Sequence, residues 1–360
     1  MLGVHSLVWD EAQKLAGKDP DYLRRDLWEA IEMGDYPEYE LGVQMIEEAD
    51  EDKFDFDILD PTKIWPEEEI PVKIIGKMTL DRNPDNFFAE TEQVAFCPAN
   101  VVPGIDFSND PLLQGRLFSY LDTQLIRLGG PNFQEIPINQ AVAKVHNNQR
   151  DGYHRHTINT GRTNYFPNSI GGGFPETASA EEHGYVNYPQ KTVGTAIRGR
   201  SEKFKDFYSQ ATMFWNSMSG PEKQHIVNAF HFEIGKVENM EVRKRMVGHL
   251  NNIDHELAVS VAEGIGVARP PKKEIPGNGK RSPAVSMADT VKDTIKSRRV
   301  AVLVADGFDE DELTQVTERL QHEGAHTKII AKMLGPVKGN KGHKINADKS
   351  HVTTGSIMFD

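Results

Sequence analysis

Three side chains between residues 116 and 127 have the types and the spacing to form a ligand site. Arg116, Tyr120 and Arg127 lie at positions i, i+4 and i+11, which fall on one side of an α-helix. A guanidinium one turn from a phenol favours the phenolate, because a nearby positive charge typically lowers an acid's pKa by about 1–3 units. A phenolate is a hard oxygen donor that suits ferric iron. The alternative is an ordinary tyrosine beside a chance arginine, since such pairs are common on helices.

The segment 110–127 predicts the amphipathic helix that must position these side chains, with Leu113 and Leu117 at helical spacing. Residues 116–124, R-L-F-S-Y-L-D-T-Q, resemble the proximal haem-ligand signature of the monofunctional haem catalases of large-subunit type. Further stretches resemble the same family, and together they extend over roughly residues 1–265. These stretches are residues 19–46, 60–72, 76–107, 147–152 and 164–169.

The resemblance implies a role for each of these side chains. Tyr120 would be the axial ligand of a ferric haem, as tyrosine is in catalases. Arg116 would keep its phenolate ionised, and Arg127 would contact a haem propionate. Five other residues match family positions that border the haem, namely Phe96, Leu112, Ser119, Thr123 and Gln124.

The activity that the resemblance implies is the conversion of hydrogen peroxide to water and dioxygen by a homotetramer with haem b or a modified haem. In that family a distal histidine and asparagine act on peroxide, and the match places both upstream of residue 1. We therefore expect a fragment, cut at both ends, that holds no catalytic residue and is a poor catalyst alone. The alternative is a non-catalytic binding or assembly fragment without haem.

The composition limits the kinds of partner and the cellular compartment that we expect for this chain. The net charge of −13 and the pI of about 5.5 argue against a nucleic-acid partner. The basic run at 338–344, KGNKGHK, is more typical of a solvated loop. Cys97 is the single cysteine, and no apolar run approaches the ~20 residues of a membrane span. We expect a cytoplasmic protein with no membrane partner.

The predicted fold class is α+β. It combines a partial antiparallel catalase β-barrel, an extended wrapping segment, an all-α domain and an incomplete flavodoxin-like α/β domain. The expected divisions are a barrel part with the ligand helix (1–127), a wrapping segment (128–200), a helical domain (201–268), a linker (269–299) and a truncated α/β domain (300–360).

Local patterns predict the elements of the first half. Residues 8–33 should form two helices that are interrupted at Pro20. Alternating apolar residues predict strands at 39–45, 54–58 and 72–80, which should pair antiparallel because no helix lies between them. Residues 82–110 should be irregular.

The second half should be helical and then mixed. Residues 201–266 should be helical, with a capping box at Ser219 and Glu222. The tail predicts a βαβ unit, with strands at 300–305 and 327–330 around a helix at 309–323.

Two weaker patterns leave alternatives open. His146, His154 and His156 could bind a metal, or they could be hydrogen-bonded loop residues, which is the more common case. The tail sequence ADGFDEDEL resembles relatives of the glutamine amidotransferases. That chemistry needs a nucleophile on a strand-to-helix turn, and Cys97 is far away in the sequence.

Overall fold

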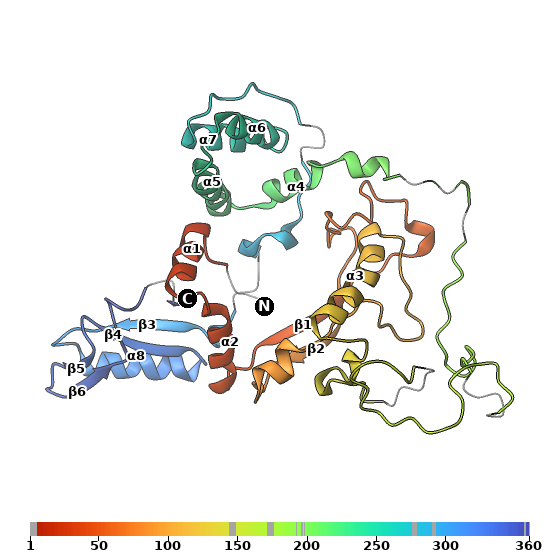
Figure 1. Ribbon diagram of the computed structural model, residues 1–360. Coiled ribbons are helices and arrows are strands. Elements are labelled where there is room, and N and C mark those ends of the chain that lie inside the picture. The colour runs from red at the N-terminus through yellow and green to blue at the C-terminus, as the bar shows by residue number, and fades with distance from the viewer. Residues whose placement is uncertain are drawn as a thin grey trace. The chain divides into compact units, whose positions relative to one another are not determined.

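The computed structural model describes residues 6–143, 149–170, 176–191, 193–195, 197, 199–275, 279–289, 293–355 and 358–359 (Figure 1). The chain divides into two compact units, which are described separately below. The first unit comprises Met1–Met45, Pro66–Arg82 and Phe207–Asp360, and the second comprises Ile46–Trp65 and Asn83–Asp206.

The first unit begins with the two predicted helices, α1 (Trp9–Lys18) and α2 (Tyr22–Glu32). They are separated at Pro20, which has no N–H for a helix interior. Strands β1 (Glu38–Val43) and β2 (Lys73–Thr79) then form an antiparallel pair, as the alternation predicted. Most of their side chains are exposed, so this two-stranded sheet is open on both faces.

Four helices of the first unit share one hydrophobic core. They are α4 (Ser209–Ser217), α5 (Gly220–Gly235), α6 (Met240–Leu250) and α7 (His255–Gly264). Leu250 and Val261 are almost completely buried in this core. The predicted capping box begins α5, and the Ser219 N–H donates to Glu222 Oε2 over 2.8 Å.

Part of the segment predicted as a linker packs against other residues of the first unit, to which it belongs. Ser282 is fully buried, its N–H donates to Ser217 Oγ over 2.8 Å, and its Oγ donates to Glu68 Oε2 over 2.7 Å. Ser286 Oγ donates to Glu222 Oε2 over 2.9 Å. Residues 282–286 are therefore held by serine hydrogen bonds, a feature that a composition rich in Pro, Gly and Lys does not reveal.

The tail of the first unit contains the predicted βαβ unit. Strands β3 (Arg299–Leu303) and β4 (His326–Ala331) are parallel and are joined by α8 (Glu310–His322). The short strand β7 (Lys349–Ser350) extends this sheet in the order β3-β4-β7. Strands β5 (Gly335–Lys338) and β6 (Lys344–Ala347) form a hairpin, and the basic run at 338–344 supplies its turn.

The second unit contains one long helix, α3 (Pro111–Arg127), which is preceded by a single π-helical turn at Phe88–Glu92. After α3, the described residues up to 200 contain two short 3-10 helices, Phe133–Glu135 and Pro137–Asn139, and no strand. The described residues between 128 and 200 are therefore largely irregular.

The predicted strand at 54–58 is wrong. This segment is bent, and the rings of Phe54 and Phe56 lie 5.4 Å apart between centroids. Asp57 accepts a hydrogen bond from the Leu59 N–H over 2.9 Å. Such local side-chain bonds to the backbone favour turns over strands. The alternation of apolar residues here reflects ring packing within a turn.

The described residues thus form a mixed α and β fold with open sheets and without a closed barrel. None of the helices described is both long and apolar enough to span a membrane.

Candidate functional site

Helix α3 carries most of the predicted site residues, and its first turn explains where it begins. Asp110 is the N-cap, and its side chain accepts a hydrogen bond from the Leu112 N–H over 2.8 Å. Pro111 follows at the first helical position, where a missing N–H costs nothing. The helix then runs without interruption to Arg127, which places Arg116, Tyr120 and Arg127 near one side.

Arg116 and Tyr120 are in contact, as their spacing predicted. Arg116 Nη2 donates to the Tyr120 hydroxyl oxygen over 3.2 Å. The guanidinium carbon lies 5.1 Å from the centroid of the phenol ring. Tyr120 is half-buried, whereas Arg116 is exposed. A donor with a permanent positive charge makes the stronger kind of hydrogen bond to a phenol oxygen.

Arg127 and Gln124 form a second cluster one to two turns further along α3. Arg127 donates to the carbonyl oxygens of Glu92 and Val94 over 2.5 and 2.6 Å, and to Gln124 Oε1 over 2.6 Å. Gln124 is buried, and its Nε2 donates to the Phe96 carbonyl oxygen over 3.2 Å. The two side chains therefore fasten residues 92–96 to the helix. The predicted contact of Arg127 with a haem propionate stays a prediction.

The remaining predicted residues lie around this helix with exposed side chains. Phe96 is 76% exposed and Leu112 is 52% exposed. Ser119 and Thr123 are exposed on α3. A half-buried phenol with a guanidinium partner suits the ferric iron of a haem, and exposed apolar side chains such as Phe96 and Leu112 suit its flat apolar body. The carbonyl acceptors of Glu92 and Val94 were not predicted, because backbone groups leave no signal in the sequence.

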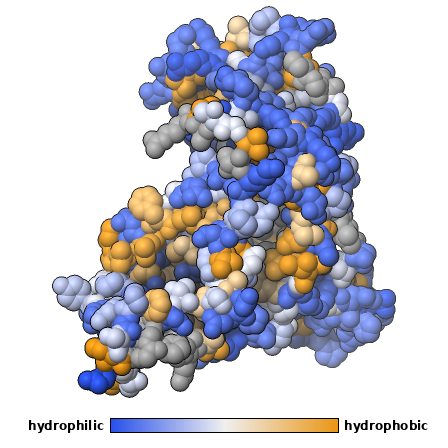
Figure 2. All heavy atoms as spheres, turned by 90° about the vertical axis from the view of Figure 1, so that its right-hand side faces the viewer, coloured by the Kyte–Doolittle hydropathy of each residue, from blue (hydrophilic) through white to orange (hydrophobic). Residues whose placement is uncertain are grey.

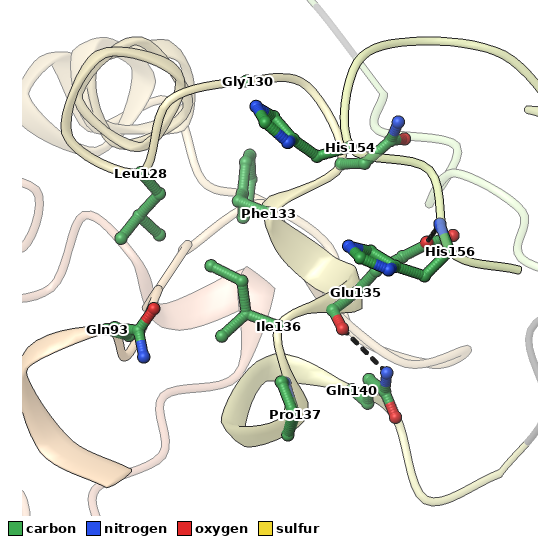
Figure 3. A pocket seen from close by; sticks show the side chains of 11 residues that line it. Gln93, Leu128, Gly130, Phe133, Glu135, Ile136, Pro137, Gln140, His154 and His156 are labelled. Atoms are coloured by element: carbon green, nitrogen blue, oxygen red, sulfur yellow. Dashed lines mark hydrogen bonds between the residues drawn. The ribbon is translucent and has the colours of Figure 1, made fainter. Parts of the chain in front are cut away.

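A pocket of about 550 Å³ lies at the C-terminal end of α3 (Figure 3). Its lining combines apolar, amide and imidazole side chains: Gln93, Leu128, Gly130, Asn132, Phe133, Glu135, Ile136, Pro137, Gln140, His154 and His156. Sequence reasoning did not find it, because its walls come from irregular segments. His154 and His156 were singled out only as part of a possible metal site.

One carboxylate lines this pocket, and it already has partners. Glu135 forms an ion pair with Arg155 over 3.1 Å and accepts from the N–H groups of His156 and Thr157. Burial opposes the charged form of Glu135, yet these N–H groups and the charge of Arg155 outweigh it, so its pKa lies below the ordinary value. Within the described residues, no group of three His, Cys, Asp or Glu side chains is arranged to hold a metal, and His146 lies outside them.

Three family models match successive parts of the chain. Residues 1–172 match the Catalase family, residues 201–265 match the family described as Catalase-related immune-responsive, and residues 298–357 match the DJ-1/PfpI family. The predicted ligand helix lies inside the first of these matches.

Similar proteins match along the whole chain. Catalase-2 of Bacillus subtilis (strain 168) is 61% identical over 360 residues, which are 100% of this chain and 52% of that protein. A catalase of Alkalihalophilus pseudofirmus is 58% identical, over 100% of this chain and 53% of its own length. Catalase HPII of Pseudomonas putida is 54% identical, over 99% of this chain and 51% of its own.

The chain spans about half the length of the curated relatives that it matches. The match nevertheless extends across the ligand helix, the helical region and the α/β tail. The chain therefore belongs to the catalase family, in its large-subunit form.

Proposed function

We propose that this chain is part of a haem catalase that converts hydrogen peroxide to water and dioxygen, in which Tyr120 would hold the haem iron through its phenol oxygen. The observation that carries the proposal is the 3.2 Å hydrogen bond from Arg116 Nη2 to the Tyr120 oxygen. The names of the relatives, all catalases, support the same activity.

Bound haem supplies the redox chemistry through which one peroxide is reduced and another is oxidised. The contribution of this chain is to present and stabilise an anionic oxygen donor. Tyr120 offers the phenol oxygen, and Arg116 stabilises the phenolate by charge and by a hydrogen bond. Gln124 and Arg127 hold residues 92–96 against α3, and so position Phe96 at the border of the site.

The proposed architecture follows the family. Strands β1 and β2 would belong to a partial catalase barrel, and β3, α8 and β4 would belong to an incomplete flavodoxin-like domain. The proposed divisions are residues 1–127, 128–200, 201–268, 269–299 and 300–360. Haem b and a modified haem are both compatible with the proximal residues, because ring modification depends on the distal pocket.

The isolated chain should have little catalase activity. We assign the distal histidine and asparagine of the family to no residue of this sequence. A general acid–base group typically contributes about 10²–10⁴-fold to a rate. The chain should therefore hold a haem site without the groups that act on the peroxide.

We further propose that the protein assembles as a homotetramer in the cytoplasm. Between residues 128 and 200 several large apolar side chains are strongly exposed, among them Ile158 at 89% and Val193 at 85%. Hydrophobic residues are also exposed between hydrophilic ones on the face drawn in Figure 2. Exposed apolar groups of this kind are typical of surfaces that contact another chain. The single cysteine, Cys97, suits a reducing compartment.

Oxygen evolution from hydrogen peroxide tests the proposed activity. The 360-residue chain would be loaded with haemin and compared with Tyr120→Phe, with Tyr153→Phe as an exposed control, and with intact Catalase-2. We expect the turnover of the unsubstituted chain to be at least about 10²-fold below that of the intact relative. Of the two variants, only Tyr120→Phe should fall further, to the level of free haemin.

Three results would contradict this proposal. Equal turnover of the unsubstituted chain and Tyr120→Phe would remove the role of Tyr120. Turnover equal to that of the intact relative would show that the chain has its own groups for acid–base work. Absence of any haemin uptake would favour the alternative, a non-catalytic assembly fragment.

A further inference from the structure

We propose that the pocket at the C-terminal end of α3 binds an aromatic carboxylate. Its volume of about 550 Å³ lies within the ~300–1,000 Å³ that is usual for small-molecule sites. None of the eight residues predicted to contact the haem lines it. The proposed binding site is therefore separate from the proposed haem site.

The apolar wall of the pocket suits a flat ring. Leu128, Phe133, Ile136 and Pro137 supply this wall. Phe133 is only 4% exposed, so its ring is fixed by packing before any ligand binds. A rigid aromatic and aliphatic wall favours an aromatic body, because rings bury a large apolar area and pack at defined offsets.

The histidines supply the polar end of the site. Figure 3 shows the imidazoles of His154 and His156 directed toward the pocket; His154 lies in a turn and His156 in the loop that follows it. Among the residues that the structure describes, neither ring has a hydrogen-bond partner or an ion-pair partner. An imidazole donates through one nitrogen when neutral and through both when protonated.

The other polar side chains around the two imidazoles are already engaged. Asn132 Nδ2 donates to the Tyr153 carbonyl oxygen over 2.7 Å, and Gln140 Nε2 donates to the Glu135 carbonyl oxygen over 2.7 Å. The Glu135 carboxylate is paired with Arg155, so it opposes a bound anion only weakly. These contacts leave His154 and His156 as donors at this end, and a carboxylate as the matching group.

The test uses naphthoate as the probe, with naphthamide as its neutral analogue. Binding to the 360-residue chain without haemin would be followed by isothermal titration calorimetry. We expect one saturable site for naphthoate and at least about tenfold weaker binding of naphthamide, since a hydrogen bond to a charged group is the stronger one.

The variants separate the imidazoles from the rest of the pocket. His154→Asn and His156→Gln should each weaken naphthoate binding about tenfold. Asparagine replaces His154 because that residue has φ +59°, a conformation that asparagine tolerates. His225→Gln, an exposed change on α5, should leave the affinity unchanged.

Three outcomes would overturn the proposal. The first is that naphthoate shows no saturable binding, and the second is that naphthoate and naphthamide bind with equal affinity. The third outcome is an unchanged affinity for naphthoate in the variant that combines both histidine changes. Both histidines are exposed, so these substitutions remove no core packing. Circular dichroism would verify that each single variant keeps the fold. One folded single variant is enough for the test.

Discussion

The contact between Arg116 and Tyr120 gives the proposed iron ligand a permanently charged hydrogen-bond partner. The guanidinium cannot lose its proton in a protein, so its effect on the phenol is permanent. Replacing Arg116 by glutamine keeps a hydrogen-bond donor but removes the charge. We expect Arg116→Gln to weaken haemin binding about tenfold or more, because the hydrogen bond to the phenol oxygen loses its charge, and charge-assisted hydrogen bonds are roughly twice as strong as neutral ones. A haemin titration followed by absorption measures the affinity.

The matched control for this prediction is Arg116→Lys. Lysine keeps the positive charge but lacks the planar fork of arginine, so it should retain most of the haemin affinity. An affinity unchanged in both variants would mean that the 3.2 Å contact has no influence on the ligand.

At the scale of elements, the Glu222 carboxylate connects the start of α5 to residues 286–288. It accepts from the Ser219 N–H and from Ser286 Oγ, and the N–H groups of Met287 and Ala288 also donate to it. Burial raises its pKa, but these hydrogen bonds outweigh burial and lower it to about 2. One carboxylate thus serves both the helix cap and the docked segment.

The lowered pKa of Glu222 predicts a loss of stability in acid. The ordinary value is 4.5, so the carboxylate is charged in both the folded and the unfolded chain above that pH, and its stabilisation is complete there. As the pH falls from 4.5 toward 2, the unfolded chain takes up the proton first, and the stabilisation is lost. Allowing for solvent screening, the effect is on the order of 2 kcal/mol.

Thermal unfolding followed by circular dichroism measures this effect. Glu222→Gln should lower the melting temperature by roughly 4–8 °C near neutral pH, and the difference from the unsubstituted chain should vanish near pH 2. The exposed carboxylate Glu238, changed to glutamine, is the control and should leave the melting temperature unchanged. A difference that persists undiminished at pH 2 would contradict the assignment.

The elements that the sequence predicted correctly are those with a strong local signal. The interruption at Pro20, the cap at Ser219 and the periodicity of α3 each depend on a few neighbouring residues. The Arg116–Tyr120 contact followed from the helix alone. In contrast, the bend at Phe54 depends on ring packing. The burial of Ser282 depends on partners that are distant in the sequence. The pocket at the C-terminal end of α3 was also missed, because loops without periodicity form it.

For the whole molecule, the exposed apolar residues between 128 and 200 predict contacts with other copies of the chain. Ile158→Glu and Val193→Glu place a charge where an apolar contact is expected, and burial of an unpaired charge is costly. We expect the unsubstituted chain to sediment as a tetramer in analytical ultracentrifugation, and each variant to sediment as a smaller species.

The control for assembly lies outside this segment. Val352 is 87% exposed, as strongly as Ile158 and Val193, so Val352→Glu introduces the same charge on a comparable surface. A monomeric unsubstituted chain would contradict the prediction. An equal loss of assembly in Val352→Glu would assign the effect to added charge in general.

The most direct test of the central claim, that Tyr120 binds haem iron, is a haemin titration of the chain beside Tyr120→Phe. We predict a saturable high-spin ferric absorption spectrum with tyrosinate character, which Tyr120→Phe abolishes and the exposed control Tyr153→Phe retains. Equal, non-saturating uptake of haemin by the unsubstituted chain and by Tyr120→Phe would contradict the claim, and catalase would then describe only the ancestry of this chain.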